Sequence, residues 1–475
     1  MKEGKKLKVK KNSFLRGIIY LLVSQIFIKI VGFAYKFYLI NKPGFGDEGN
    51  AIYSSGFQIY ALLLAFSSTG VSSAISKLVS EELAIGDSKG AHRIFKISLI
   101  TFSIFGIIGS ALLFFEAKKI SINWIQIPKA ENSLVCLAPS IFFVSIISVF
   151  RGYYNGRQKF EIMAKSQMFE QIFKTVFTIV LVELVIKLQR KETYIMAGAA
   201  NLATTFATII CFLYIYLHYQ KESKNIKKKI QRTNVYKVNG IRKTIKKILS
   251  DSVPISLGSI IASFNKTIDS LTVVRFLKHT INEEDAIIQY GILSGKVDII
   301  CSAVIALNVA FVTAFIPSIV RSYTKKDYKN MYKKIRIFII TTIIIGIPYT
   351  LLMMLFPDKI LKILFPNASS GAVYLKFSSI SIIFMLLTQT VNTILQALGK
   401  VKIPPISLGI GLIFKLICNI SLIPNSKIGI FGAIIGNISY NIISFFISTI
   451  LLLKVLFYIK ISMNNKEEIN KGIKI

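Results

Sequence analysis

The sequence of 475 residues has little acid, little imidazole and little sulfur. It has 23 Asp and Glu residues against 59 Lys and Arg, with only three His and four Cys. The cysteines lie in separate apolar runs without CxxC spacing, which favours packing over disulfides or a thiolate metal site; they are Cys136, Cys211, Cys301 and Cys418. The histidines are far apart, so we expect no metal and no cofactor.

Apolar residues, by contrast, are abundant in the sequence. Hydrophobic residues make up 53% of the chain, and its mean hydropathy is +0.58. Such a composition is typical of a polytopic membrane protein. A net charge of +36 in a soluble protein would point to nucleic acid. Here the basic residues cluster between apolar runs and no groove-reading motif is present, so no nucleic-acid partner is expected.

Long apolar runs predict the fold class, an all-α polytopic membrane protein. A membrane-spanning helix needs about 20 mostly apolar residues. Candidate spans lie at about 14–40, 51–76, 94–115, 133–154, 164–187, 194–218, 253–277, 287–317, 336–356, 372–398, 403–424 and 428–458.

Charge between the spans predicts their orientation. The loops after the fourth, sixth and eighth spans are rich in Lys and Arg, whereas "GFGDEGN" (44–50) and "NEED" (282–285) are acidic. Because basic loops stay in the cytoplasm, both termini are expected there. The first apolar run extends to Ile40 without a small-residue cleavage site, so we interpret it as a retained span rather than a signal peptide.

A long basic segment divides the chain into two sets of six spans. "FKTVFTIVL" (173–181) in the fifth span is similar to "FKLICNISL" (414–422) in the eleventh. Such similarity indicates a parallel repeat of two six-helix lobes around a central substrate site. The expected domains are a basic N-terminus at 1–13, an N-lobe at 14–219, a basic linker at 220–250, a C-lobe at 251–460 and a tail at 461–475.

Ionisable residues inside the predicted spans are the candidate site residues, because a charge in the bilayer is costly. The candidate binding residues are Lys29, Lys36, Lys266, Asp269, Arg275, Lys296 and Asp298. Some of these charges also have a purely structural explanation. Lys36 and Arg275 could extend toward the interface, and Asp269 could neutralise Lys266 one turn away. In the fifth span, Glu170 and Lys174 are spaced to pair with each other.

The candidate residues carry an excess of positive charge. Five are basic and two are acidic, which leaves a surplus of three positive charges. A surplus of one sign in a wet pocket of low dielectric suits a ligand of the opposite sign. The sequence therefore predicts an anionic ligand, such as a phosphate or diphosphate.

Several motifs resemble a known family of exporters. They are "KIVGFAYKFYL" (29–39), "GDEGNAIY" (46–53), "GVSSAISKLVSE" (70–81), "RGYYNGRQ" (151–158), "YGILSGKVD" (290–298) and "AFIPSIVRSY" (314–323). Together they resemble the polysaccharide-transport branch of the multidrug/oligosaccharidyl-lipid/polysaccharide (MOP) exporter superfamily. Within it, the similarity is to MurJ-type lipid II flippases and stage V sporulation protein B-like proteins.

The resemblance implies two six-helix lobes around a cavity, as in MATE-like folds, and an undecaprenyl-diphosphate-linked sugar as substrate. It places family cavity charges on the first, second, seventh and eighth spans. By motif, the first-span positions correspond to Lys29 and Lys36, the latter with a possible one-residue offset at Tyr35. Many lipid II flippases have fourteen spans, whereas this chain offers twelve.

The expected function is therefore that of a flippase rather than an enzyme. It would carry a lipid-linked precursor of peptidoglycan, spore wall or another polysaccharide across the bacterial plasma membrane, acting as a monomer. One alternative is a cation-coupled multidrug exporter, which should have a cavity rich in acids. A second is a membrane glycan polymerase or glycosyltransferase, which would need a positioned acid, base or metal.

Overall fold

The computed structural model describes residues 2–67, 69–190, 192–231 and 240–472, and every regular element in these ranges is a helix. This confirms the all-α fold class. Five parts of the predicted domains lie outside the described residues: residue 1 of the N-terminus, residues 68 and 191 of the N-lobe, 232–239 of the linker and 473–475 of the tail.

The chain divides into two compact units. The first comprises Met1–Ile299, Asp358–Gly371 and Ile423–Ile430, and the second comprises Ile300–Pro357, Ala372–Leu422 and Phe431–Ile475. The helices that start the predicted C-lobe pack on α2 and α3 and therefore fall in the first unit. That the lobes 14–219 and 251–460 move relative to each other as two bodies stays a prediction.

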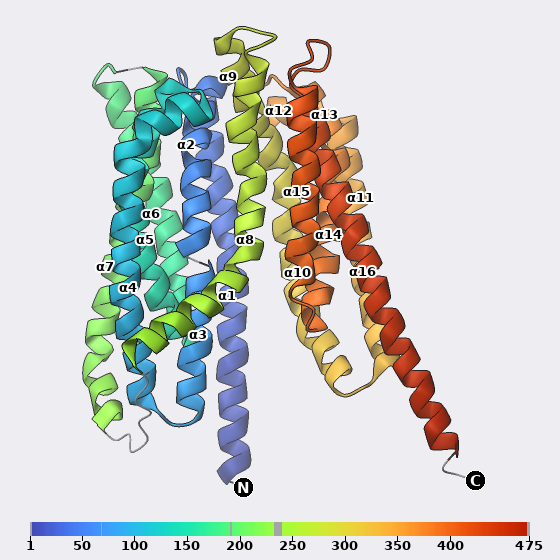
Figure 1. Ribbon diagram of the computed structural model, residues 1–475. Helices are drawn as coiled ribbons and strands as arrows, with labels where there is room; N and C mark the ends of the chain where they lie inside the picture. The colour runs from blue at the N-terminus through green and yellow to red at the C-terminus, as the bar shows by residue number, and fades with distance from the viewer. Residues whose placement is uncertain (1, 68, 191, 232–239, 473–475) are drawn as a thin grey trace. The chain divides into compact units, whose positions relative to one another are not determined.

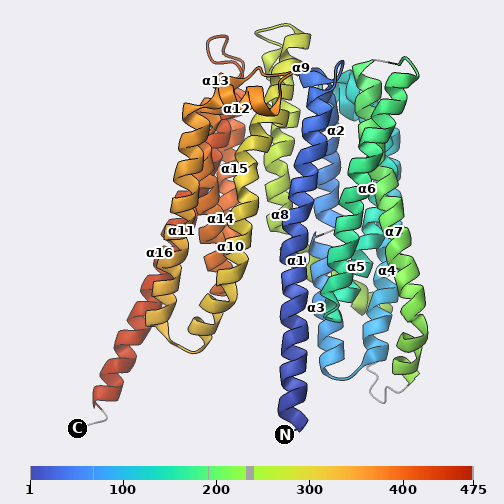
Figure 2. The ribbon, with the colours of Figure 1, turned by 180° about the vertical axis from the view of Figure 1, so that it is seen from behind.

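The first unit is a bundle of long helices (Figures 1 and 2). Its elements are α1 (Lys2–Asn41), α2 (Gly46–Ser67), α3 (Thr69–Ala84), α4 (Ser88–Lys119), η1 (Ile120–Ile125), η2 (Pro128–Ala130), α5 (Glu131–Gly156), α6 (Phe160–Lys187), α7 (Thr193–Gln231), α8 (Ile241–Leu277), α9 (Glu283–Gly291) and η3 (Ile292–Val297), with most of α12 (Pro357–Leu364). Helix α1 lies along α6, and α2 contacts α5, α7, α8 and α9.

Polar side chains mark where helices of this unit begin. The Asp87 carboxylate accepts a hydrogen bond of 2.7 Å from the Gly90 N–H and caps α4. Asn282 caps α9 in the same way by accepting from the Asp285 N–H. Each cap satisfies a backbone donor that has no partner within its own helix.

Glycine lets α3 and α5 approach closely beside the apolar core of the first unit. A Cβ atom added at Gly152 would lie 2.7 Å from the Ser72 carbonyl oxygen. At Gly156 it would lie 2.7 Å from the Ser76 carbonyl oxygen, one turn along α3. Both obstacles are backbone atoms, so the helices could accept a side chain here only by moving apart.

Replacing Gly152 with alanine is therefore expected to destabilise the protein by about 1–3 kcal/mol, the usual cost of overpacking. The measurement is the apparent melting temperature of the purified protein in detergent. Gly198→Ala is the control, because a Cβ atom there would meet Asn132 Cβ at an ordinary 3.5 Å. Equal melting temperatures for the two variants would contradict the close packing of α3 and α5.

The second unit is a smaller helical bundle. Its elements are α10 (Asp298–Thr324) from Ile300 onward, α11 (Tyr328–Leu355), α13 (Ala372–Ser378), α14 (Ile380–Ala397), α15 (Ile403–Leu422) and α16 (Phe431–Gly472). Helix α16 packs on both α14 and α15, and α11 packs on α14. Buried polar side chains also join the helices: the Thr342 and Thr390 hydroxyls are 2.8 Å apart, and Lys415 donates to the Asn437 side chain at 2.8 Å.

Ten of the twelve predicted spans coincide with helices that are long and apolar enough to cross a membrane within the described residues. The other two, 164–187 and 253–277, coincide with α6 and most of α8. These two helices carry several of the ionisable residues, including Glu170 and Lys174 on α6 and Lys266 and Asp269 on α8. Their ionisable residues lower the mean hydropathy of these two helices.

Candidate functional site

Two lysines of α1 and one of α8 form the centre of the candidate site. Lys29 and Lys36 are seven residues apart, so they share a helix face about 10 Å apart along the axis. Lys29 is exposed and Lys36 is partly buried. Both lie within electrostatic range of Lys266, and Lys36 also lies within range of Asp298. We call Lys29, Lys36, Lys266 and Asp298 the α1–α8 charge cluster.

One ion pair is part of this cluster. Lys266 Nζ lies 3.7 Å from Asp298 Oδ2, and the two side chains are 44% and 26% exposed. Such a partly solvated, long ion pair contributes little to stability. It can therefore be separated at small cost when another charged group approaches.

The cluster retains positive charge after this pairing, since three ammonium groups face one carboxylate. Like charges repel one another, although solvent screens part of that repulsion where the groups are exposed. A bound anion would relieve that repulsion. The arrangement therefore suits a ligand with two or more negative charges, such as a diphosphate.

A π-helix lies just before α10. Element η3 connects α9 to α10; Lys296 lies within it, and Asp298 is the first residue of α10. Residues two apart on a helix do not face each other. Glycine is required here, because a Cβ atom at Gly295 would lie 2.0 Å from the Asn50 side chain. The glycine-containing "YGILSGKVD" motif thus shapes the contact of η3 with α2.

Lys296 belongs to a different, closed network. Its side chain is fully buried, and its ammonium donates to Asp47 Oδ2 at 2.9 Å, the Ala368 carbonyl at 2.7 Å and Ser370 Oγ at 2.9 Å. All three donor positions are used in these contacts. The structure therefore does not bring Lys296 to the α1–α8 charge cluster.

Two further predicted residues lie on α8. Arg275 donates to the Asn123 carbonyl in η1. Asp269 is buried, with 6% of its surface exposed. The ion pair of Lys266 with Asp298 connects α8 to the first residue of α10.

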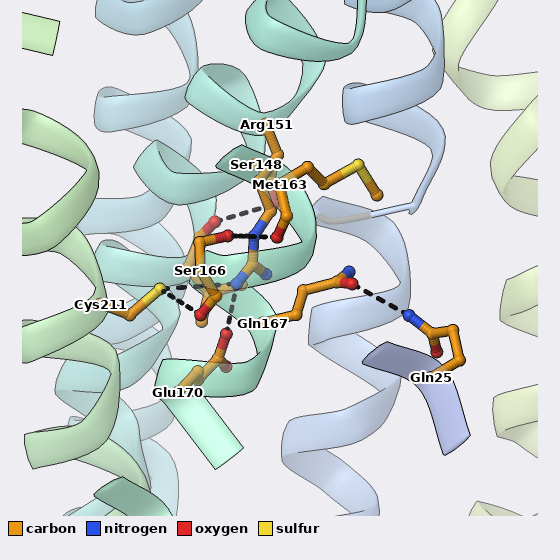
Figure 3. Close-up of polar contacts among 9 residues, drawn as sticks. Gln25, Ser148, Arg151, Met163, Ser166, Gln167, Glu170 and Cys211 are labelled. Carbon is orange, nitrogen blue, oxygen red and sulfur yellow. Dashed lines mark hydrogen bonds and ion pairs between the residues drawn. The ribbon is translucent and has the colours of Figure 1, made fainter. Parts of the chain in front are cut away.

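The expected pairing of Glu170 with Lys174 was wrong. Glu170 Oε2 instead accepts a hydrogen bond of 2.7 Å from Arg151 of α5 (Figure 3). Arg151 also donates to Ser166 Oγ at 3.0 Å and to Cys211 Sγ at 3.4 Å. A guanidinium with several donors bonds α5, α6 and α7 together here, and it takes the carboxylate that the local spacing assigned to Lys174.

Lys174 is a buried lysine that the sequence analysis did not include among the candidate binding residues. Its side chain is buried, at 8% exposed. Its ammonium lies 4.1 Å from the Phe57 ring centroid and 5.4 Å from that of Tyr35. Lys36 makes a similar contact with Tyr53, at 5.8 Å. The signal was available in the sequence as a lysine in mid-span, but the Glu170 spacing offered a simpler explanation.

Comparisons with known proteins agree with this arrangement of helices. The family model described as polysaccharide biosynthesis protein matches residues 14–323, which is more than half of the chain, and the MatE model matches 292–420. Stage V sporulation protein B of Bacillus subtilis (strain 168) is 23% identical, over 89% of this chain and 80% of that protein. Lipid II flippase MurJ of the same organism is 24% identical, over 87% and 78%.

Solved structures of transporters share the fold. An inward-facing multidrug resistance MATE family transporter of the MOP superfamily superimposes with a TM-score of 0.67 at 15% identity, covering 92% of this chain and 99% of that one. Its outward-facing counterpart gives 0.64 at 15% identity, covering 94% and 96%. A MOP superfamily transporter from Pyrococcus furiosus, whose binding pocket has reverse polarity, gives 0.62 at 14% identity, covering 93% and 96%.

Proposed function

Because the chain belongs to the polysaccharide biosynthesis protein family and has the fold of MOP superfamily transporters, we propose that it is a lipid-linked sugar flippase. It is a multi-pass membrane protein. The proposed substrate is a polyprenyl-diphosphate-linked sugar that serves as a precursor of peptidoglycan or a related polysaccharide. The flippase and sporulation protein among its relatives support this class of substrate.

One observation supports the proposal: Lys29 and Lys36 are both within electrostatic range of Lys266, which pairs with Asp298. In the proposed complex the diphosphate accepts hydrogen bonds from these ammonium groups. Asp298 holds Lys266 while the site is empty and releases it to the ligand. The long, partly solvated Lys266–Asp298 pair supports this exchange. The predicted roles of Asp269, Arg275 and Lys296 in binding stay predictions.

The proposed mechanism is alternating access in the plasma membrane, with both termini in the cytoplasm. The head group enters from the inner side, the polyprenyl tail stays in lipid, and rocking of the two lobes exposes the head group outside. The basic loops support the orientation. Each elementary charge that crosses the full membrane field is worth about 2.3 kcal/mol per 100 mV, so an inside-negative potential favours outward movement of the anionic head group.

A flipping assay in proteoliposomes tests the proposal. The triple variant Lys29→Ala/Lys36→Ala/Lys266→Ala is compared with wild type for movement of a fluorescent polyprenyl-diphosphate-linked disaccharide between leaflets. Each lost charge-assisted hydrogen bond is worth about 1.5–3 kcal/mol, and 1.4 kcal/mol is tenfold. We expect the rate to fall at least about tenfold even if a single bond is lost.

The control triple variant replaces Lys118, Lys119 and Lys187, which are exposed and lie at the ends of α4 and α6. It changes the net charge equally and is expected to flip at the wild-type rate. A normal rate in the folded cluster variant would reject the proposed role of these lysines. In cells, loss of the protein is expected to leave a lipid-linked sugar intermediate on the inner side.

A cation-coupled drug exporter is the second candidate, favoured by the MatE match over residues 292–420 and by the MATE-type fold. The sign of the α1–α8 charge cluster argues against it, since an organic cation would meet three ammonium groups. Uptake of a fluorescent organic cation into the same proteoliposomes, driven by a proton or sodium gradient, separates the two functions.

A further inference from the structure

A second group of positive charge lies on α1 and α6: Lys36 is partly buried and Lys174 is buried. Lys174 and Lys36 are near enough to repel each other electrostatically. Neither ammonium makes a hydrogen bond or an ion pair with any residue that the structure describes. Two neighbouring ammonium groups that are at least partly buried normally need a counter-ion, because each uncompensated buried charge costs several kcal/mol.

The protein offers these lysines aromatic rings instead of acids. Lys174 Nζ contacts the faces of Phe57 and Tyr35, and Lys36 Nζ lies over Tyr53. The rings are held in place by one another: Tyr53 stacks on Phe57 with ring planes 10° apart, and the Tyr35 and Tyr53 hydroxyls are 3.1 Å apart. Cation–π contacts stabilise an ammonium by about 0.5–2 kcal/mol, which is less than the cost of burial.

The nearest acid is already engaged. Glu170 lies one turn before Lys174 on α6, but its carboxylate accepts the 2.7 Å hydrogen bond from Arg151. A ring face accepts no conventional hydrogen bond, so the N–H donors of both ammonium groups can still bond to another group. The charge of Lys36 and Lys174 is therefore neutralised neither by a direct ion pair nor by the aromatic contacts.

A buried hydroxyl on α6 provides an independent indication of a ligand. Thr178 is four residues after Lys174, so it lies on the same helix face one turn further on. Its side chain is fully buried, yet its Oγ1 has no hydrogen-bond partner among the residues in the described ranges. Such buried, unsatisfied polar atoms are rare in folded proteins and call for a partner.

We propose that Lys36, Lys174 and Thr178 form an anion-binding site inside the first unit, which takes a small anionic group through two ammonium groups and one hydroxyl. The group is an inorganic anion such as chloride or phosphate, or a phosphate of a lipid head group. The site is distinct from the α1–α8 charge cluster, although Lys36 belongs to both. It does not rest on the proposed flipping activity.

Thermal unfolding of the full chain in detergent tests the site. Wild type is unfolded in sodium gluconate, and then with chloride, phosphate or undecaprenyl diphosphate added at constant ionic strength. A ligand that binds only the folded protein raises the melting temperature. We expect a concentration-dependent rise with chloride or phosphate, and loss of that rise in Lys174→Met, which keeps the length of the side chain and removes its charge.

Two further variants make the test specific. Thr178→Val keeps the shape of the side chain, removes the hydroxyl and should weaken anion binding about tenfold, as loss of one hydrogen bond to a charged group does. Lys187→Met, at the exposed end of the same helix, should keep the full response. If Lys174→Met does not fold, Lys174→Gln takes its place.

Each outcome decides the question. A Lys174-dependent rise with chloride or phosphate supports an inorganic anion as the occupant. A Lys174-dependent rise with undecaprenyl diphosphate alone supports the same site with a head-group phosphate as the occupant. Absence of a Lys174-dependent rise with any of the three anions overturns the proposal. The flipping assay is a separate measurement, so failure of one proposal leaves the other standing.

Discussion

Replacing Asp47 with asparagine is expected to lower the free energy of unfolding by about 3–5 kcal/mol, the usual cost of leaving a buried charge unpaired. The Lys296 side chain is fully buried and its partner Asp47 is 11% exposed. Loss of the carboxylate leaves the ammonium with the Ala368 carbonyl and the Ser370 hydroxyl as its remaining hydrogen-bond acceptors. Urea unfolding of the purified protein in detergent measures the loss.

The neighbouring acid provides a matched control. Glu48 follows Asp47 in the first turn of α2, but its ion pair with Lys129 is exposed, at 36% and 51%. Glu48→Gln is therefore expected to cost at most about 1 kcal/mol. The double variant Asp47→Leu/Lys296→Met should recover most of the stability lost in Asp47→Asn, since apolar replacement of a buried pair is often neutral. Equal losses for Asp47→Asn and Glu48→Gln would contradict the closed network around Lys296.

The spans could be predicted from the sequence because the bilayer imposes a simple rule on them. Apolar runs of sufficient length form helices, since no other local structure satisfies the backbone in lipid. The runs 133–154 and 403–424 coincide with α5 and α15 in this way. The glycines of the "RGYYNGRQ" motif also follow from packing, because α5 meets α3 there without space for a side chain.

The partners of the charges could not be predicted, because they depend on contacts between distant segments. Lys296 and Asp47 are 249 residues apart in the sequence. The acidic "GFGDEGN" segment was interpreted as evidence for orientation and as part of a family motif, although one of its acids, Asp47, pairs with a buried lysine. Spacing within one helix gave Glu170 and Lys174 as partners, but Arg151 of α5 is a better donor for that carboxylate.

Only part of the candidate site could be predicted from the sequence, because the site also depends on contacts between distant segments. Lys29 and Lys36 were candidates because each places a charge inside a predicted apolar span, and both lie within electrostatic range of Lys266. Residues two apart on a helix point in different directions, so the sequence already indicates that Lys296 and Asp298 do not pair with each other. Their actual partners, Asp47 and Lys266, could not be predicted.

Glu170→Gln is the second substitution with a large expected effect. Arg151 and Glu170 are 13% and 27% exposed, and the guanidinium also donates to Ser166 and Cys211. Neutralising the acid leaves a largely buried cation that only neutral groups contact directly. Because Glu170 retains some solvent, we expect a loss near the lower end of the about 3–5 kcal/mol typical of broken buried pairs.

The same helix supplies the control for this prediction. Glu161 pairs with Lys165 at 2.7 Å in the first turns of α6, with both side chains about half exposed, at 52% and 51%. Glu161→Gln should therefore change the unfolding free energy by less than about 1 kcal/mol. A double-mutant cycle of Arg151→Met and Glu170→Gln should give a coupling energy of about 1–3 kcal/mol. A coupling near zero would mean that Arg151 holds α5, α6 and α7 together without its carboxylate, and Glu170 would then be available to neutralise Lys174.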